Sequence, residues 1–437
     1  MKNQFLPSAF CIATLLFVIT TDANSQTTPK TTVKTGAGKL IELPEADLTA
    51  SKTNFSKVVP WPEGKTPTAP EGFVVSKFAE GMKSPRNIVI APNGDVIVVL
   101  SNSQRTRTEQ AANVASGKAQ SEVQGKSVNT IMLFRDADKD GKPEVVSTFL
   151  TGLNQPYGAA FIDNSFYVAN TDGVWMYPYQ NGDTEIKGAG KKILELPAGG
   201  YNNHWTRNLI TNAAKTKIYV TVGSGSNVAE RGLPNEIRRA NILEINPDGS
   251  GEKIYGSGLR NPVGMAWAPG TNALWTAVNE RDGLGDDLVP DYITSVKPGA
   301  FYGWPFSYFG QNEDPRLKGQ NPELVAKAIV PDIPVGAHTA SLGLAFYTAK
   351  KFPAKYQGGV FIGQHGSWNR SELVGYKVAF IPFKQGKPAG PLEDFLTGFI
   401  KDNKEVYGKP VGVAVAQDGA LLVADDVSGI IWRVAVK

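Results

Sequence analysis

The sequence predicts an all-β protein, a six-bladed β-propeller built of four-stranded antiparallel blades. Short runs of Val, Ile, Tyr and Trp bounded by Gly, Asn, Asp and Pro occur throughout the 437 residues, whereas apolar residues at helical spacing are scarce. One pattern recurs six times: a polar residue, often a proline, a small residue, an alternating strand, a turn and a second strand. The copies start roughly 50 to 80 residues apart, which is enough for one blade each.

Each copy of the pattern opens on a polar side chain. The copies are SPRNIVIAPNGDVIVVL from Ser84, QPYGAAFIDNSFYVAN from Gln155, HWTRNLITNAAKTKIYVTVG from His204, NPVGMAWAPGTNALWTAV from Asn261, HTASLGLAFYTAKKFPAKYQGGVFIG from His338 and KPVGVAVAQDGALLVAD from Lys409. A two-sheet sandwich is the alternative, but a sandwich would not need six such openings. We expect GFVVSKFA, residues 72–79, to pair with IIWRVAV as the outer strand of the last blade, which removes an exposed sheet edge.

The chain divides into three segments. Residues 1–25 begin with a lysine, continue through a short apolar run and end in small residues, which predicts a secretory signal peptide and a periplasmic or secreted protein. Residues 26–70 are rich in Thr, Lys and Pro and predict an extended N-terminal segment that serves as a tether. Residues 71–437 form the propeller domain. The only cysteine, Cys11, lies in the signal peptide, so the mature chain would have neither a disulfide nor a thiolate site.

Composition excludes two classes of partner. With 45 basic and 41 acidic residues the net charge is +4, and the absence of a long basic run gives a nucleic-acid partner little support. After the signal peptide no segment approaches about 18 consecutive apolar residues, so we expect no membrane span.

Residues at the six repeat openings should converge, because the innermost strand of each propeller blade lines the central channel. The convergent set holds three fixed cations, two amides and two imidazoles: Arg86, Gln155, His204, Arg260, Asn261, His338 and Lys409. Arg pairs with an anionic group through two N–H groups at once, and Lys is a compact point charge. The collar therefore suits a ligand that carries several carboxylates or phosphates.

The stretch NERDGLGDDLVPDYI, residues 279–293, is a candidate metal loop. It is bent by glycines and carries five acids within a dozen residues: Glu280, Asp282, Asp286, Asp287 and Asp291. Oxygen ligands in an irregular loop favour a hard cation, with Ca²⁺ ahead of Mg²⁺. A solvated acidic loop without metal is the alternative.

A second acidic turn, DADKDGKPE from Asp136, has the D-x-D-x-D-G opening of a calcium loop. Asp136, Asp138 and Asp140 would be the ligands, but Ser147 stands at the twelfth position, where such loops have a bidentate glutamate. An Asp-Gly turn without metal is an equal alternative.

Five motifs taken together point to a known family: SGLRNPVGMAW, NERDGLGDDLVPDYITSVKPGAFYGWPFSYFGQ, GAHTASLGLAFY, GQHGSWNRSELVGYKV and KPVGVAVAQDGALLVADD. They resemble the soluble pyrroloquinoline quinone (PQQ) dependent sugar dehydrogenases, within them the L-sorbosone dehydrogenase-like members of the glucose/sorbosone dehydrogenase branch. The resemblance covers roughly residues 70–437. It implies a six-bladed propeller that binds PQQ and calcium at the channel mouth, oxidises an aldose or related aldehyde, and passes electrons to a small redox carrier or a cytochrome.

The resemblance also implies residue roles. His204 corresponds to the catalytic base, which accepts the proton of a substrate hydroxyl while hydride moves to the quinone. Arg260 and Asn261 correspond to the pair that contacts the quinone. The main-chain carbonyls of Asp282 and Gly283 correspond to the calcium ligands.

Further cofactor contacts follow from the same resemblance. Arg370 and Lys409 lie where basic groups hold the quinone carboxylates, and the amide near the quinone is Asn154 or Gln155. His338 belongs to the cofactor pocket as a wall, as a substrate contact or as a second base.

Three features depart from the family pattern. Ser224 stands where glucose-oxidising relatives place an acid that would orient the histidine, so the partner of the His204 ring is an open question. Lys409 stands where relatives often have Arg. The polar stretch SQRTRTEQAANVASGKAQSEVQGKSVNT from Ser103 lacks strand periodicity and predicts a mobile flap beside the pocket.

Two other functions are compatible with a propeller. A calcium-dependent lactonase or esterase would need several carboxylate or amide side chains around a channel metal, whereas the repeat openings supply cations. A non-catalytic binding propeller would use the same mouth to recognise a ligand.

Overall fold

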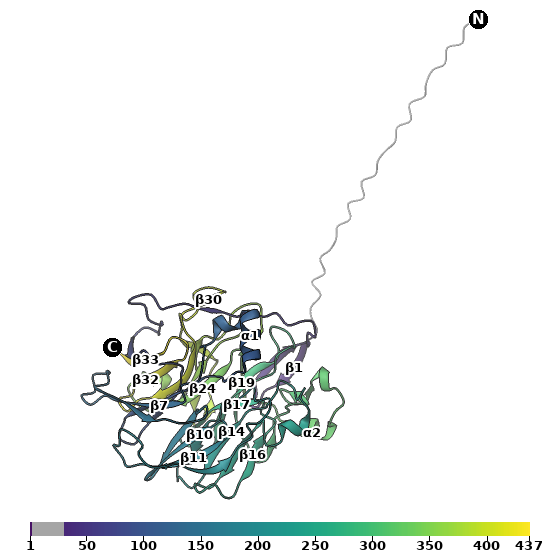
Figure 1. Cartoon of the computed structure of the whole chain (residues 1–437). Helices are drawn as coiled ribbons and strands as arrows, with labels where there is room; N and C mark the ends of the chain where they lie inside the picture. Colours follow the sequence, from purple (N-terminus) through teal and green to yellow (C-terminus); the bar gives the residue numbers. More distant parts are fainter. Residues whose placement is uncertain (2–29) are drawn as a thin grey trace.

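The computed structural model of the chain describes Met1 and residues 30–437. Apart from Met1, the predicted signal peptide therefore lies outside the described residues, as do the first residues of the segment 26–70. Six antiparallel sheets form a ring, which is the predicted six-bladed propeller (Figure 1).

The blades follow one another along the chain, and the strands of each blade run in order from the innermost outward. The first two blades are β5 (Pro85–Ile90), β6 (Val96–Leu100), β7 (Thr130–Arg135) and β8 (Val145–Leu150), then β9 (Gly158–Ile162), β10 (Ser165–Asn170), β11 (Gly173–Pro178) and β12 (Lys191–Glu195). The third is β13 (Leu209–Thr211), β14 (Ile218–Val222), β15 (Asn241–Ile245) and β16 (Lys253–Ser257), extended by β20 (Ala300–Phe301).

The remaining three blades complete the ring. The fourth is β17 (Asn261–Trp267), β18 (Leu274–Asn279), β19 (Pro290–Ser295) and β23 (Ile333–Ala337). The fifth is β24 (Ser341–Phe346), β25 (Val360–Gln364), β26 (Lys377–Ile381) and β29 (Glu393–Leu396). The sixth is β31 (Pro410–Val415), β32 (Leu421–Asp425), β33 (Ile430–Val436) and, from the other end of the chain, β4 (Phe73–Ala79).

The pairing of β4 with β33 confirms the predicted closure of the ring. The strands are antiparallel, with Val75 opposite Val434 and Val74 opposite Ala435. Joining the first propeller strand to the last blade ties the two ends of the domain together and leaves no open edge at the junction.

A glycine at four of the six repeat openings lets neighbouring innermost strands approach closely. A Cβ atom on Gly158 would overlap the backbone nitrogen of Leu209 in the next blade. Where the third blade has Asn208 instead, its side-chain amide donates a hydrogen bond of 2.8 Å to the carbonyl oxygen of Val263 in the fourth blade. The six openings are thereby held around one channel.

Apolar side chains fill the spaces between neighbouring blades. The cluster between the first and second blades contains Ile97 and Phe166, both fully buried. The cluster between the fifth and sixth blades is aromatic, with Trp432 and Phe361 at 0% exposure. Packing of this kind fixes the blades relative to one another and so fixes the residues at the channel mouth.

Residues 30–70 lie against the propeller, which differs from the predicted tether. β1 (Lys30–Lys34) and β2 (Leu40–Pro44) form a hairpin, and β3 (Lys57–Val58) pairs in parallel with β30 (Glu405–Val406). The buried amide of Asn54 donates hydrogen bonds of 3.0 and 2.9 Å to the carbonyl oxygens of Ser371 and Asn403. The composition of the segment could not reveal this packing, because its hydrogen-bond partners lie more than 300 residues away in sequence.

The polar stretch from Ser103, predicted to be a flap, contains a short helix, α1 (Arg107–Ala115), and a 3-10 turn, Lys118–Ser121. Thr106 and Glu109 form a capping box: the Thr106 hydroxyl accepts from the backbone N–H of Glu109, and the Glu109 carboxylate accepts from that of Thr106. In Figure 1 α1, β1 and β30 lie along the same side of the molecule.

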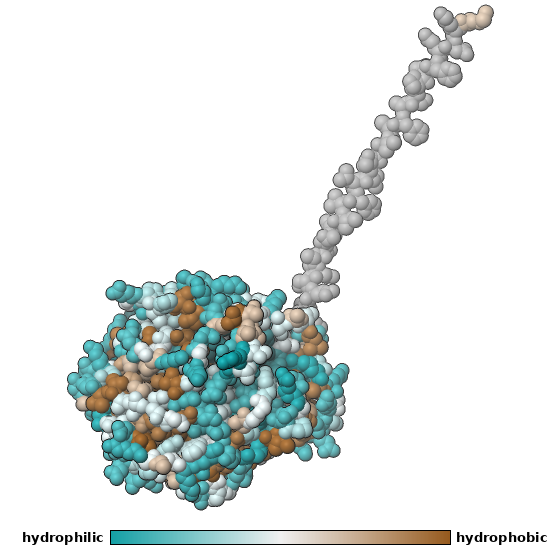
Figure 2. All heavy atoms as spheres, in the orientation of Figure 1, coloured by the Kyte–Doolittle hydropathy of each residue, from teal (hydrophilic) through white to brown (hydrophobic). Residues whose placement is uncertain are grey.

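Among the described residues, neither α1 nor α2 (Pro322–Lys327) is long and apolar enough to cross a bilayer. The face seen in Figure 2 is largely hydrophilic, with small hydrophobic patches scattered between polar residues. Scattered apolar residues of this kind are ordinary on protein surfaces.

Candidate active site

A cavity of about 240 Å³ at the channel mouth brings together most of the residues predicted to converge. Its lining includes six of the seven: Arg86, His204, Arg260, Asn261, His338 and Lys409. These residues come from the openings of five different blades. The repeat phase therefore placed them correctly without any knowledge of the contacts between blades.

The ring of His204 is held by Ser224. Its Nδ1 atom lies 2.9 Å from both the carbonyl oxygen and the Oγ atom of Ser224, and this Oγ donates its own hydrogen to the carbonyl oxygen of Ser226 at 2.7 Å. A carbonyl oxygen only accepts hydrogen bonds, so Nδ1 carries the hydrogen and Nε2 keeps its lone pair. The group that orients His204 is thus a main-chain carbonyl assisted by a hydroxyl.

An acid, Glu236, lies near His204 but contacts the residues that follow Ser224 and not the ring itself. The buried carboxylate of Glu236 accepts hydrogen bonds from the backbone N–H of Gly225 at 2.7 Å and from the hydroxyl of Ser226 at 2.5 Å. Glu236 therefore stabilises the loop whose Ser224 orients the His204 ring. This role could not be predicted from the sequence, because a long loop separates Glu236 from β14 and no motif links it to His204.

Burial, together with the positive charge of Arg260, lowers the pKa of His204 to about 3. The imidazole is therefore neutral near pH 7 and can accept a proton at Nε2. The same low pKa makes it a weak base, because basicity follows the pKa of the conjugate acid.

Arg260 has all five of its N–H groups directed at protein acceptors. Nε donates to the carbonyl oxygen of Asn227 at 3.1 Å, and Nη1 donates to those of Asn279 and Glu280 at 3.3 and 2.7 Å. Nη2 donates to Oδ1 of Asn227 at 2.8 Å and to a carboxylate oxygen of Asp282 at 3.4 Å. Arg260 thus contributes charge and holds the loop in place, and it has no free N–H pair for a two-pronged carboxylate contact.

Of the predicted calcium ligands, the carbonyl oxygen of Asp282 is not available to a cation in this arrangement. The carbonyl oxygen of Asp282 already accepts from the side-chain amide of Asn227 at 3.0 Å and from Nη1 of Arg316 at 2.8 Å. Two donors occupy both lone pairs of a carbonyl oxygen, and a guanidinium repels a divalent cation. A calcium ion could bind to this oxygen only after Arg316 had moved away.

His338 is held as a cation. Its Nε2 atom lies 3.0 Å from the carbonyl oxygen of Gly285, and its Nδ1 atom lies 3.3 Å from a carboxylate oxygen of Asp282. Burial opposes a charge here, but the hydrogen bond and the negative charge of Asp282 raise the pKa of His338 above its ordinary value. With both ring nitrogens donating, His338 is a contact on the cavity wall and has no lone pair to act as a second base.

The third histidine, His365, is paired with Asp426. Its Nε2 atom lies 3.0 and 3.1 Å from the two carboxylate oxygens, and Nη1 of Arg86 lies 2.5 Å from one of them. Burial raises the pKa of Asp426, but His365 and Arg86 outweigh it and hold that pKa well below its usual range. The sequence did not predict a role for Asp426, because two successive acids at the end of a strand, here β32, are typical of an ordinary turn.

Lys409 is a buried cation that lies in the mouth cavity without a counter-ion. It is 5% exposed, and its Nζ atom lies 5.4 Å from the centre of the Tyr376 ring. Across residues 30–437 its ammonium takes part in no hydrogen bond or ion pair, and burial lowers the pKa of Lys409 to about 8. An anionic group bound in the cavity would supply the missing partner.

Aromatic rings close the outer side of the cavity. Trp368 is 38% exposed and stacks on Phe55, with ring centres 5.7 Å apart and planes 7° from parallel. The Lys118 ammonium lies 5.3 Å from the centre of the Trp368 ring. The three residues come from the N-terminal segment, the polar insertion and the loop after β25, so only the fold shows that they meet.

Two predicted cofactor contacts lie outside the lining of this cavity. Gln155 is buried, and its side-chain amide donates to the carbonyl oxygen of Asn102 at 3.1 Å. Arg370 directs its Nη2 atom towards a carboxylate oxygen of Asp287, 3.4 Å away. In the described structure neither side chain lines the mouth cavity.

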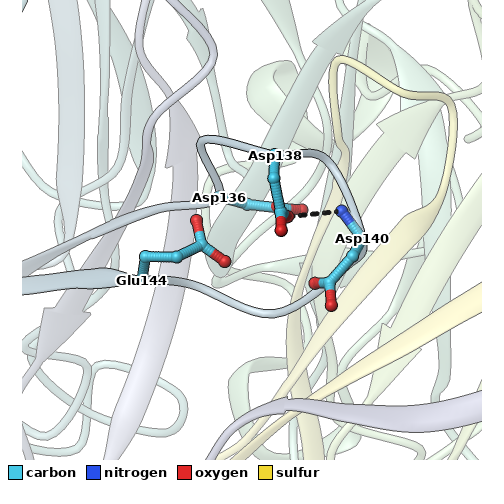
Figure 3. A group of neighbouring side chains, drawn as sticks. All are labelled: Asp136, Asp138, Asp140 and Glu144. Carbon is cyan, nitrogen blue, oxygen red and sulfur yellow. Dashed lines mark hydrogen bonds between the residues drawn. The ribbon is translucent and has the colours of Figure 1, made fainter.

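The second acidic turn gathers four carboxylates (Figure 3). One oxygen from each of Asp136, Asp138, Asp140 and Glu144 lies within 4.8 Å of the others. Glu144 stands at the ninth position of the motif and was not among the predicted ligands, because calcium loops of this type have their glutamate at the twelfth position. Figure 3 shows the carboxylates facing a common space in the loop between β7 and β8, and none of the four residues lines the mouth cavity.

Several proteins are similar to this chain in sequence. An uncharacterised protein of Borreliella burgdorferi is 28% identical over 448 residues, which cover 99% of both chains. An aldose sugar dehydrogenase of Escherichia coli is 37% identical over 123 residues, which are 27% of this chain and 30% of the relative. A PQQ-dependent pyranose dehydrogenase of Coprinopsis cinerea is 23% identical over 83% of this chain, which spans about half, 53%, of that relative.

Solved structures share the fold. The PQQ domain of the Coprinopsis cinerea pyranose dehydrogenase, in its holo form, superposes with a TM-score of 0.67 at 19% identity, covering 86% of this chain and 98% of the domain. The PQQ-bound aldose sugar dehydrogenase of Streptomyces coelicolor gives 0.54 at 18% identity, covering 85% and 100%. Residues 67–301 and 309–437 match the TrAA12-like family. This match spans most of the chain, and the protein therefore belongs to the TrAA12-like family of propellers, whose relatives include PQQ-dependent sugar dehydrogenases.

Proposed function

We propose that the protein is a PQQ-dependent oxidoreductase that oxidises an aldose or a sugar aldehyde such as sorbosone. One observation carries the proposal: His204, a neutral imidazole whose Nε2 lone pair has only a 3.5 Å contact from the exposed amide of Asn203, lines the same cavity as Lys409, a buried ammonium without a counter-ion. The first suits proton abstraction from a hydroxyl, and the second suits a carboxylate of the cofactor. The sugar dehydrogenases among the relatives support the same chemistry.

The cavity lining fits an anionic planar cofactor. Lys409 would hold a carboxylate, and the face of Trp368, backed by Phe55, would take the ring system. Asn261 lines the same cavity and offers a neutral amide to the cofactor. When bound, PQQ supplies the electrophilic quinone carbon that accepts the hydride.

The protein's own part in the reaction is proton transfer and positioning. His204 accepts the hydroxyl proton of the substrate at Nε2, while Ser224 keeps the hydrogen on Nδ1. The charge of Arg260 keeps His204 neutral beforehand and stabilises the alkoxide character that develops on the substrate oxygen. No step is assigned to calcium at Asp282 and Gly283, because Arg316 occupies that carbonyl oxygen.

The rival lactonase or esterase is less well supported by the same geometry. A catalytic metal would need free carboxylates, but Asp282 faces Arg260 and His338, and Glu280 is bonded to Arg281. Asp291 accepts hydrogen bonds on both oxygens. A non-catalytic binding propeller is the remaining alternative.

The site of action belongs to the proposal as well. The lysine, short apolar run and small residues within residues 1–25 support export, so we place the activity in the periplasm or outside the cell. Electrons would leave the reduced cofactor to an external small redox carrier or a cytochrome.

Reconstitution tests the proposal. Purified protein is mixed with PQQ, with either Ca²⁺ or a chelator, and dye reduction is followed with a panel of aldoses and sorbosone. We expect turnover with at least one of these substrates. PQQ binding without turnover on any of them would favour the binding propeller, and no PQQ binding would refute the proposed cofactor.

The variant His204→Ala separates catalysis from binding. We expect it to bind PQQ as the wild type does and to lose on the order of 10²–10⁴-fold in kcat, which is the usual contribution of a general base. Cofactor binding is measured by titration of the PQQ absorbance. A fully active variant would eliminate His204 as the base.

A further inference from the structure

A second cavity, of about 170 Å³, lies next to the mouth cavity and under the polar insertion, residues 103–128. We call it the side cavity. The two cavities share four lining residues: Arg86, Ser121, Glu122 and His365. Its volume equals that of about five or six water molecules at ~30 Å³ each, which is enough space for much of a monosaccharide ring.

Uncharged polar side chains are the largest group in the lining of the side cavity. These hydroxyls and amides belong to Ser84, Asn102, Ser103, Gln110, Asn113, Ser121 and Gln124. An amide both donates and accepts hydrogen bonds, as a sugar hydroxyl does, so the two groups satisfy each other in pairs. This lining differs from that of the mouth cavity, where Lys409 leaves a charge without a partner.

The charged groups in the side cavity neutralise one another. Arg105 binds Glu122 through two N–H groups, at 3.3 and 3.0 Å. On the opposite wall Asp426 is shared by Arg86 and His365. Because every charge already has a partner there, the side cavity has little affinity for an ion and is suited to a neutral ligand.

We propose that the side cavity binds the neutral, hydroxyl-bearing part of a carbohydrate, and that the insertion thereby sets sugar specificity. The inference rests on the proposed function for its catalytic consequence, since a sugar held there would meet the mouth cavity at the wall of Arg86 and His365. A negatively charged sugar acid would bind less well than the neutral aldose.

The insertion also allows a clean test. Asn102 donates to the carbonyl oxygens of Val123 and Gly125, both at 3.2 Å, and so anchors the far end of the insertion to the propeller. Helix α1 has no buried residue, and within it Asn113 lines the cavity while Val114 is 68% exposed. Substitutions at these two neighbouring positions leave the propeller core untouched.

The experiment compares Asn113→Phe, which fills the cavity, with Val114→Phe, which adds the same ring to the outer side of the helix. Asn113→Leu keeps the side-chain size and removes only the amide. Binding of D-glucose and D-gluconate to the protein without PQQ is measured by calorimetry, and KM and kcat are measured after reconstitution. Circular dichroism confirms that each variant is folded.

We expect Asn113→Phe to weaken D-glucose binding and to raise KM by about tenfold or more, and Asn113→Leu to have a smaller effect in the same direction. PQQ affinity and kcat should stay within about threefold, and Val114→Phe should match the wild type. In a Lys409→Met background, which removes the unpaired cation of the mouth cavity, D-gluconate should bind more weakly than D-glucose.

The outcomes separate this inference from the proposed function. Loss of D-glucose binding in Asn113→Phe would support the inference even if the protein showed no PQQ-dependent turnover. An active reconstituted enzyme whose KM and D-glucose affinity are unchanged by both Asn113 variants would overturn it and leave the proposed function intact. Tighter binding of D-gluconate than of D-glucose in the Lys409→Met background would also overturn it.

Discussion

The two acidic loops of the molecule differ in what faces their carboxylates. In the mouth loop, residues 279–293, Arg281 is 0% exposed between Glu280 and Asp314, and Asp282 lies between Arg260 and His338. In the turn from Asp136 to Glu144 the carboxylates accept only backbone N–H groups of the turn itself. The same density of acids in the sequence therefore produces a neutralised network in one place and a cluster of like charges in the other.

This difference shows why acidic residues alone are a weak indicator of a metal site. The mouth loop had both the composition and the resemblance in its favour, yet Arg260, Arg281 and Arg316 supply the positive charge around it. Arg281 belongs to the loop itself, whereas Arg260 and Arg316 come from other parts of the chain, and the acidic residues of the loop do not indicate that these two will face it. Substitutions in the two regions can test how much each depends on its counter-charges.

The largest effect should come from Arg281→Met. The substitution leaves the buried carboxylate of Glu280 without its partner and leaves Asp314 with Arg316 alone. Breaking a buried pair typically costs about 3–5 kcal/mol of unfolding free energy. Urea unfolding measures the change. Arg238→Met is the control, because its pair with Glu252 is partly exposed and should be worth no more than about 1 kcal/mol. Equal losses in the two variants would mean that the mouth loop does not depend on buried charge compensation.

Lys409→Met should act in the opposite direction on stability. The folded-state pKa of about 8 lies below the ordinary value of 10.5, so the charged lysine destabilises the fold below pH 8, and this penalty fades as pH rises from 8 to about 10.5. Removing it should raise the unfolding free energy at pH 7 by on the order of 2–3 kcal/mol. PQQ affinity should fall in the same variant. A loss of stability at pH 7 would contradict the assignment of an uncompensated cation.

The pH profile tests the effect of the mouth charges on His204. With a pKa of about 3, His204 stays deprotonated through the neutral range, so its protonation should limit kcat only as pH falls towards 3. Ser224→Asp places a negative charge beside Nδ1 and should raise this pKa, which moves the acidic limb of the profile to higher pH. Steady-state rates between pH 3 and 8 measure both. If the acidic limb of the profile did not shift in an active, folded Ser224→Asp protein, that limb would not report the protonation of His204.

The smallest effect should come from Asp138→Asn in the other loop. Removing one of four crowded carboxylates relieves repulsion, and we expect a gain of a few tenths of a kcal/mol in unfolding free energy in the presence of a chelator. Asp163→Asn is the control, because Asp163 faces Lys215 and should show no gain. Thermal melts at low ionic strength resolve the difference, and a loss of stability in Asp138→Asn would contradict the repulsion argument.

Much of the mouth could be predicted, and the exceptions have identifiable causes. Arg86, His204, Arg260, Asn261, His338 and Lys409 meet because each occupies the same phase of the repeat. Gln155 has that phase too, but its side chain bonds to the carbonyl oxygen of Asn102 instead of lining the mouth cavity. Asp426 and Phe55 had no signal of their own, since each acts through a partner distant in sequence. Glu236 acts through Gly225 and Ser226 in the same loop, but no motif links these residues.

Strand period, repeat spacing and the small residue at each opening are local properties of the chain. They were sufficient to predict the six blades, the closing strand β4 and the convergence of the repeat openings. Protonation states and charge compensation depend on groups brought within hydrogen-bonding distance by the packing of different blades. For that reason the neutral state of His204, the cationic state of His338 and the occupied carbonyl of Asp282 became evident only once the blades were assembled.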